Sequence, residues 1–139
     1  DHRSQINILR DRHSENPLDR VQPVVTKDEL LQLIQEARTV EANDRIFDYV
    51  TTLAEATRTH PMVELGVSPR GALALCRMAK AHAFLAGRDY VVPEDVAAVF
   101  PDVCAHRLIL SAKARMMEEK AENILAEILK SVDMPVLKA

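Results

Sequence analysis

The sequence contains little glycine and few aromatic residues. Glycine occurs three times in 139 residues, aromatic side chains make up 4% of the chain, and tryptophan is absent. Such a composition argues against sheets with glycine-rich hairpins, and it leaves no phosphate loop of the G-x-x-x-x-G-K-[ST] kind. Apolar residues still reach 47%, which is enough for one buried core. With so much alanine and leucine, a mainly α-helical domain is expected.

An excess of positive charge, a long hydrophobic run and a rich set of cysteines are also missing. The net charge is −3, so there is no basic surface that would indicate a nucleic-acid partner. No apolar run is long enough to cross a membrane and no signal peptide is visible, so we expect no membrane insertion and a cytoplasmic location. Cys76 and Cys104 lie in apolar helical stretches, which predicts buried, reduced thiols.

Residues for catalysis or metal binding do not form a recognisable set. The histidines are scattered and have no metal-ligand spacing, so His82 and His106 are expected to be surface or hydrogen-bonded helical residues. Neither cysteine has a histidine at a helical neighbour position. The acidic residues Glu118, Glu119 and Glu122 resemble a solvated face. We therefore expect no catalytic residue and no metal site in this chain, and no enzyme activity of its own.

Periodicity and helix-end signals predict a small bundle of about five to seven helices. Thr26 and Glu29 form a capping box that opens a helix, and Asn43 or Asp44 opens the next one. A short strand at 62–67 is expected to pair with an extended segment at 108–116. The predicted helices cover about 4–13, 27–40, 44–58, 68–87 and 121–132, with two short ones beginning at Pro93 and Pro101 and a connector at 14–24.

The helix at 68–87 has both ends marked, and its first turn is unusual. Ser68 suits the N-cap, Pro69 the first helical position and Gly87 the stop. Arg70 falls where the helix dipole is positive, a position that disfavours a cation. An arginine beside a helix start is suited to binding an anion such as phosphate, and Gly71 is expected to leave the turn open to its approach. Alternatively, Arg70 pairs with an acid such as Glu64 or points into water.

The same helix is expected to supply most of the core. Its apolar side chains recur at helical spacing, and a buried leucine or phenylalanine there would cost about 2–5 kcal/mol on truncation to alanine. The predicted core residues are Leu73, Leu75, Cys76, Ala79, Ala83 and Phe84.

The stretch ELGVSPRGALALCRMAKAHAFLAGRDYVVPEDVAAVFPDVCAHRLIL resembles the helical lid of the MoxR family of AAA+ ATPases. The segments NPLDRVQPVVTKDELLQLIQEARTV, NDRIFDYVTTLAEATR and AENILAEILKSVDMP extend the likeness over nearly the whole chain. The resemblance implies one lid domain over 1–139, with 1–23 connecting to an ATPase core and 24–139 forming the lid. The chain begins without methionine, so we expect it to be part of a longer protein.

In that family the lid arginine called sensor 2 reaches the γ-phosphate of ATP bound in the core. The resemblance assigns this role to Arg70, with Ser68, Pro69 and Gly71 as the weaker flanking motif. ATP and Mg²⁺ would belong to the parent protein, whose core carries the Walker motifs, sensor 1 and arginine finger that this chain lacks. Val92 stands where the family often has threonine, which weakens the cap of the next helix.

The resemblance also implies partners. These are the chain's own N-terminal ATPase core, neighbouring subunits of a ring, expected to be a hexamer, and proteins with a von Willebrand factor A domain that such rings remodel as chaperones. The alternative is a self-contained helical domain that binds a partner helix in an apolar groove and has no nucleotide role.

Overall fold

The computed structural model describes residues 1–12 and 17–136, and these form two compact units, Asp1–Gln32 and Leu33–Ala139. The first unit holds helix α1 (His2–Arg12), a 3₁₀ turn at Pro17–Arg20 and the start of helix α2 (Lys27–Thr39). The helix expected at 4–13 is therefore present, while its predicted end at His13 and residues 14–16 of the predicted connector lie outside the described residues.

The capping box at the start of α2 is confirmed. The backbone N–H of Glu29 donates to Oγ1 of Thr26 at 3.2 Å, and the N–H of Thr26 donates to Oε2 of Glu29 at 2.7 Å. Two otherwise unpaired donors of the first turn are thus satisfied.

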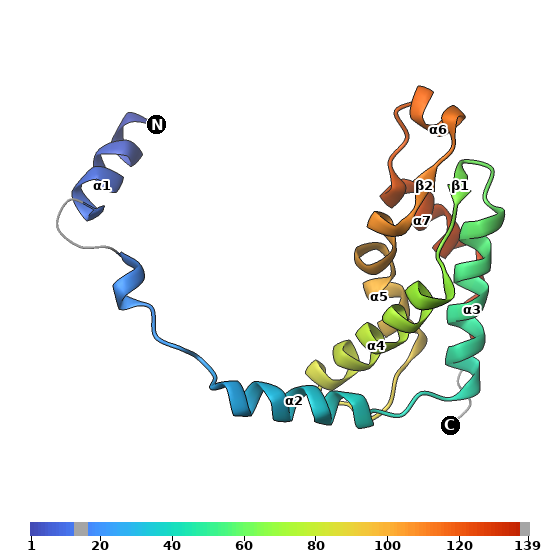
Figure 1. Cartoon of the computed structure of the whole chain (residues 1–139), viewed down its shortest axis with the longest axis horizontal. Helices are drawn as coiled ribbons and strands as arrows, with labels where there is room; N and C mark the ends of the chain where they lie inside the picture. Colours follow the sequence, from blue (N-terminus) through green and yellow to red (C-terminus); the bar gives the residue numbers. More distant parts are fainter. Residues whose placement is uncertain (13–16, 137–139) are drawn as a thin grey trace. The chain divides into compact units, whose positions relative to one another are not determined.

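The second unit is a helical bundle with one small sheet (Figure 1). Its helices are α3 (Asp44–Thr59), α4 (Pro69–Leu85), α5 (Pro93–Cys104), α6 (Ala112–Met116) and α7 (Ala121–Ser131). Strand β1 (Val63–Leu65) pairs antiparallel with strand β2 (Ile109–Leu110). The mainly α fold with a short two-stranded pairing is therefore confirmed.

The core of this unit lies between α3, α4, α5 and α7. Helix α3 contributes a stripe at helical spacing, α4 contributes small residues that allow close packing, and α5 and α7 close the remaining sides. The largest fully buried apolar side chains are Ile46, Val50, Leu53, Val67, Leu75, Val96, Phe100, Ile124, Leu125 and Ile128.

The prediction that α4 supplies most of the core was wrong, because α3 and α5 each contribute more buried apolar residues, and the face of α4 that meets the core also differs from the prediction. Its buried residues are Gly71, Leu75, Ala79 and Ala83, which recur every four residues. Leu73 lies off this stripe and is 59% exposed, so its assignment to the core was wrong. Cys76 and Phe84 are half-buried and pack against the margin of the core, while Leu75, Ala79 and Ala83 are confirmed.

Helix α5 continues through Pro101, so the prediction of two short helices was wrong. A proline inside a helix removes one backbone hydrogen bond, at a cost of about 3 kcal/mol. Val99, Phe100, Val103 and Cys104 lie on both sides of Pro101 and are buried. The burial of these side chains offsets the lost bond and holds the last turn of α5 in place.

The extended segment predicted at 108–116 is shorter than expected. Only Ile109–Leu110 form a strand, and Ala112–Met116 form helix α6. Oγ of Ser111 accepts from the N–H of Ala114 at 3.3 Å, which caps this helix. Met116, the last residue of the segment predicted to be extended, is 87% exposed. Within residues 1–12 and 17–136, no helix has both the length and the apolar character needed to cross a membrane.

Candidate functional site

The start of α4 is capped as the sequence predicts. Oγ of Ser68 accepts from the N–H of Gly71 at 3.2 Å, and the carbonyl of Ser68 accepts from the N–H of Ala72 at 3.0 Å. Pro69 has no N–H to donate. Among the described residues, the first turn therefore leaves the N–H of Arg70 as its one free backbone donor. An anion approaching here would meet the guanidinium of Arg70 rather than a cluster of free N–H groups.

Arg70 is exposed on the surface of the first turn of α4. In the part of the chain that the structure describes, its guanidinium has no ion pair and no side-chain hydrogen bond. Glu64, which could have compensated it, lies 3.8 Å from Nη1 of Arg115 instead. The charge of Arg70 thus opposes the helix dipole without an internal acid to balance it.

The connector that leads into α4 is fixed to the end of α3 by two side chains. Oγ1 of Thr57, a buried residue, accepts from the N–H of Val67 at 2.8 Å and donates to the carbonyl of Ala54 at 2.6 Å. Nε of Arg58 donates to the carbonyl of Val67 at 2.8 Å. Both backbone groups of Val67 are therefore held by α3, and this places the start of α4.

Gly66 allows this connector to lie directly on the backbone of α3. A Cβ added at Gly66 would lie 2.6 Å from the backbone nitrogen of Arg58 and 2.7 Å from its Cα. Contacts this short do not occur between real side chains and backbone, so the approach requires glycine at this position.

The sequence suggests that Gly71 leaves the turn open to a ligand, but the structure contradicts this expectation. Gly71 is buried, and a Cβ added to it would lie 2.7 Å from Cγ1 of Val67 and 3.4 Å from Cδ of Arg107. The space beside Gly71 is therefore filled by this chain's own side chains. Its small size lets the first turn of α4 pack closely against the connector and Arg107.

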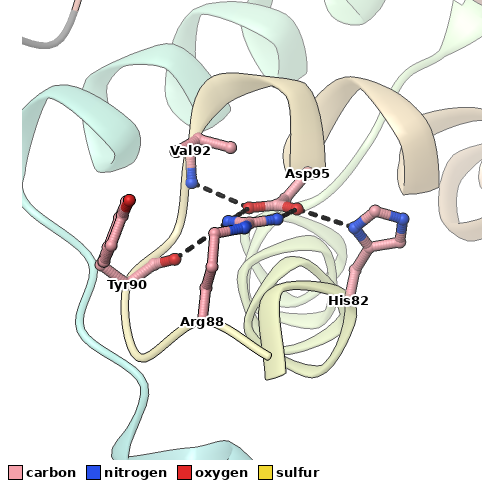
Figure 2. A network of polar contacts seen from close by, with 5 residues as sticks. All are labelled: His82, Arg88, Tyr90, Val92 and Asp95. Atoms are coloured by element: carbon pink, nitrogen blue, oxygen red, sulfur yellow. Dashed lines mark hydrogen bonds and ion pairs between the residues drawn. The ribbon is translucent and has the colours of Figure 1, made fainter. Parts of the chain in front are cut away.

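A second polar cluster joins the end of α4 to the start of α5 (Figure 2). Asp95, 1% exposed, accepts from Nη1 and Nη2 of Arg88 at 2.7 and 2.5 Å and from the N–H of Val92 at 2.8 Å. Nδ1 of His82 lies 2.7 Å from Oδ1 of the same carboxylate. The expectation of a hydrogen-bonded surface histidine is therefore confirmed for His82.

The charge of Asp95 is stabilised by these donors. Burial by itself would raise the pKa of Asp95, but the hydrogen bonds from Arg88, the N–H of Val92 and His82 outweigh burial and hold the pKa below its ordinary value of 3.8. An ionised carboxylate only accepts hydrogen bonds, so Nδ1 of His82 is the protonated ring nitrogen. The carboxylate also supplies the cap that the side chain of Val92 cannot provide.

The remaining candidate residues are the possible metal ligands, the two cysteines and the acidic residues near α7. The described residues contain no group of three or more His, Cys, Asp or Glu side chains that could hold a metal ion. Both cysteines are free: Cys104 is fully buried, and burial raises its pKa to about 11, whereas Cys76 is half-buried. Glu118 and Glu122 are exposed, as expected of a solvated face.

The sequence revealed the positions of Arg70 and its cap but not their supports. Thr57 and Arg58 resemble ordinary residues of a helix end, and they contact a segment about ten residues away in the chain. Gly66 was the available signal, because a glycine just before a capped helix in a chain so poor in glycine indicates a close backbone approach. Asp95 lies in the first turn of α5, and the sequence does not predict its pairing with Arg88.

Comparison with known proteins places this geometry in a family. Residues 55–128 match the family model described as the AAA lid domain. The chain is 36% identical over 135 residues to the uncharacterized protein YeaC of Bacillus subtilis, covering 97% of this chain and 42% of that protein. It is 33% identical over 125 residues to the chaperone MoxR1 of Mycobacterium tuberculosis, covering 84% of this chain and 33% of that protein.

The fold is also similar to a solved structure. The crystal structure of a "putative ATPase" from Cytophaga hutchinsonii matches with a TM-score of 0.82 and 31% identity, over 98% of this chain and 44% of that chain. The chain thus spans less than half the length of each of these relatives. By the family model, the relatives and the fold, this chain belongs to the AAA lid domain family and is a helical lid of the MoxR type of AAA+ ATPases.

Proposed function

We propose that this lid senses the γ-phosphate of ATP bound by an ATPase core, and that Arg70 is the residue that contacts it. The observation that carries the proposal is the exposed guanidinium of Arg70 in the first turn of α4, without an ion pair among the described residues. A cation opposed to the helix dipole becomes favourable when an anion arrives, because dipole and guanidinium then attract it together. Ser68 and Pro69 fix the turn that presents it.

In this proposal the lid and the core have different roles in ATP hydrolysis. ATP and Mg²⁺ would be bound by the core of the parent protein, and the lid would add one preorganised cation where negative charge develops during hydrolysis. Loss of the γ-phosphate would remove the anion that Arg70 contacts and release the lid, which converts hydrolysis into movement. The isolated chain is expected to show no steady ATP turnover and only feeble nucleotide affinity.

The wider assembly is proposed from the relatives. We infer a ring of such ATPases, a hexamer, in which the lid contacts its own core and neighbouring subunits. Its task would be chaperone-like remodelling or activation of proteins, among them proteins with a von Willebrand factor A domain; the name of the relative MoxR1 supports the chaperone role. We place it in the cytoplasm, where free thiols such as Cys76 and Cys104 stay reduced. The net charge of −3 argues against nucleic acid as the partner.

The test is ATP turnover of the full ATPase with and without Arg70. Arg70→Ala should lower hydrolysis about 100-fold, the effect of removing one donor that stabilises developing charge. Arg70→Lys should restore it only in part, because an ammonium lacks the planar fork of guanidinium. Arg77→Ala, seven residues along the same helix, is the control and should retain nearly full turnover. Equal rates for the wild type and Arg70→Ala would refute the proposal.

A further inference from the structure

A groove with a volume of about 670 Å³ lies between the last turns of α2 and the middle of α4. Ile34 of α2 and Leu73 and Cys76 of α4 line it with apolar surface. Leu73 is 59% exposed and Ile34 is 41% exposed, although each sits on a helix of the second unit. Large apolar side chains left open beside one another commonly mark a surface that another molecule covers.

Three cations line the same groove. Arg38 comes from the last turn of α2, and Arg77 and Lys80 come from α4. Nζ of Lys80 donates to the carbonyl of Arg38 at 3.3 Å, which ties the end of α2 to α4 and forms one wall of the groove. None of the three has a carboxylate partner among the described residues, since the ion pairs there involve other side chains.

The charge of the groove contrasts with that of the chain. The 139 residues together carry a net charge of −3, yet every charged residue lining this groove is positive. An apolar floor with a positive rim is complementary to a helix that presents apolar side chains flanked by carboxylates. The volume accommodates a few side chains from one face of such a helix rather than a whole folded domain.

We propose that this groove binds an acidic amphipathic helix of a separate partner protein. Its apolar side chains contact Leu73 and Ile34, and its carboxylates pair with Arg77, Lys80 and Arg38. Because Arg77 follows Arg70 by two helical turns on α4, the groove lies on the same side of that helix as the proposed phosphate contact. Binding of the helix does not itself require nucleotide.

The thiol of Cys76 provides a reporter for this groove in the 139-residue chain. Cys104 is fully buried, whereas Cys76 is half-buried and lines the groove, so an uncharged maleimide should label Cys76 rather than Cys104 in the folded protein. The probe is a synthetic helical peptide of about four turns, with leucines at i and i+4 flanked by glutamates. It should slow labelling of Cys76 in a saturable way, and a matched peptide with lysines in place of the glutamates should not.

Charge-reversal variants distinguish specific binding in the groove from non-specific binding of the peptide. Arg77→Glu should weaken binding of the glutamate peptide about tenfold or more and strengthen that of the lysine peptide. Lys113→Glu makes the same change in net charge on α6, away from the groove, and should leave both affinities unchanged. Leu73→Ala should weaken the glutamate peptide, whereas Leu85→Ala, an exposed leucine of α4 outside the groove, should not. Thermal unfolding of each variant checks that the fold is retained.

Three results would overturn the proposal. The first is equal protection by both peptides, or by neither. The second is protection of Cys76 by ATP alone, which would make the groove part of a nucleotide site. The third is protection that rises with the concentration of the chain itself, which would make a second copy the occupant. None of these experiments measures ATP hydrolysis, so their outcome does not depend on the proposed role of Arg70.

Discussion

The starts of α4 and α5 are built from similar residues, and they are completed in opposite ways. Each helix has proline as its first residue. At α5 the third residue is Asp95, a buried acid that satisfies the helix start and binds Arg88. At α4 the second residue is Arg70, an exposed cation with the wrong sign for the helix dipole and no ion pair in the described part of the chain.

The difference separates a stabilising helix start from one available to a ligand. The cluster around Asp95 joins α4 to α5 and leaves no charge uncompensated, so it contributes to folding. The turn at Arg70 is held by Thr57, Arg58 and Ser68, but no acidic side chain within residues 1–12 and 17–136 pairs with the charge that it presents. A site that is structurally supported and electrostatically incomplete is suited to bind an anion.

Removing Asp95 should have the largest effect on stability among the changes at the two helix starts. Asp95→Ala leaves the guanidinium of Arg88 without its anion and the N–H of Val92 without an acceptor, so we expect a loss of about 3 kcal/mol. Urea unfolding followed by circular dichroism measures this. Arg70→Ala is the matched charge deletion at the other helix start and should change stability by less than about 0.5 kcal/mol. Similar losses for both variants would contradict the contrast between the two helix starts.

Gly66→Ala should destabilise the support of Arg70 by about 2–3 kcal/mol. The new Cβ would lie 2.6 Å from the backbone nitrogen of Arg58, and a helix backbone yields little. Gly71→Ala is the control, since its Cβ would meet the side chain of Val67 at 2.7 Å and a side chain can shift. We expect about 1 kcal/mol there, from the same unfolding measurement. A smaller loss for Gly66→Ala than for Gly71→Ala would show that the connector does not depend on the approach to α3.

Low pH should remove the contribution of the start of α5 to the stability of the fold, but not that of the start of α4. The pKa of Asp95 is lowered in the folded chain, so its contribution is complete above the ordinary value of 3.8 and is lost as the pH falls below 3.8 through the folded pKa. Asp95→Asn should remove this dependence and flatten the acid limb of stability against pH. Arg70→Ala should leave the slope of that limb as it is in the wild type. If stability falls as steeply with acid in Asp95→Asn as in the wild type, other carboxylates cause the loss of stability at low pH.

Leu73→Ala should have the smallest effect, a loss below about 0.5 kcal/mol, because this side chain is mostly exposed. Leu75→Ala, two residues away and fully buried, should cost about 2–5 kcal/mol. Denaturation of the pair compares the two faces of α4 directly. A loss of more than about 1 kcal/mol for Leu73→Ala would place it in the core after all.

Local signals in the sequence predicted most helix ends correctly. Ser68, Asn43 and the Thr26–Glu29 box cap the helices that they were expected to cap, and Gly87 has the positive φ of 75° that suits the end of α4. These signals work because the caps are satisfied by residues within three or four positions.

The errors arise where distant packing decides. Leu73 and Leu75 are equally apolar, and only the position of α3 and α5 determines which of them is buried. Pro101 is a local signal for a new helix, but burial of Phe100 and Val103 around it keeps α5 continuous. The supports of Arg70 were missed for the same reason, since the bonds from Thr57 and Arg58 connect α3 to a separate segment.

The anchoring of Val67 to α3 has a mechanical consequence. If Arg70 contacts an anion as proposed, a displacement of its backbone would reach Val67 through the first turn of α4, and α3 through two hydrogen bonds. At the far end of α4, the ion pair of Arg88 and Asp95 would pass the same displacement to α5. Because hydrogen bonds or an ion pair hold the segments next to both ends of α4, we expect this helix to move as one rigid element with its neighbours. A displacement at Arg70 would then shift α3 and α5 together with α4 instead of being absorbed in a loop.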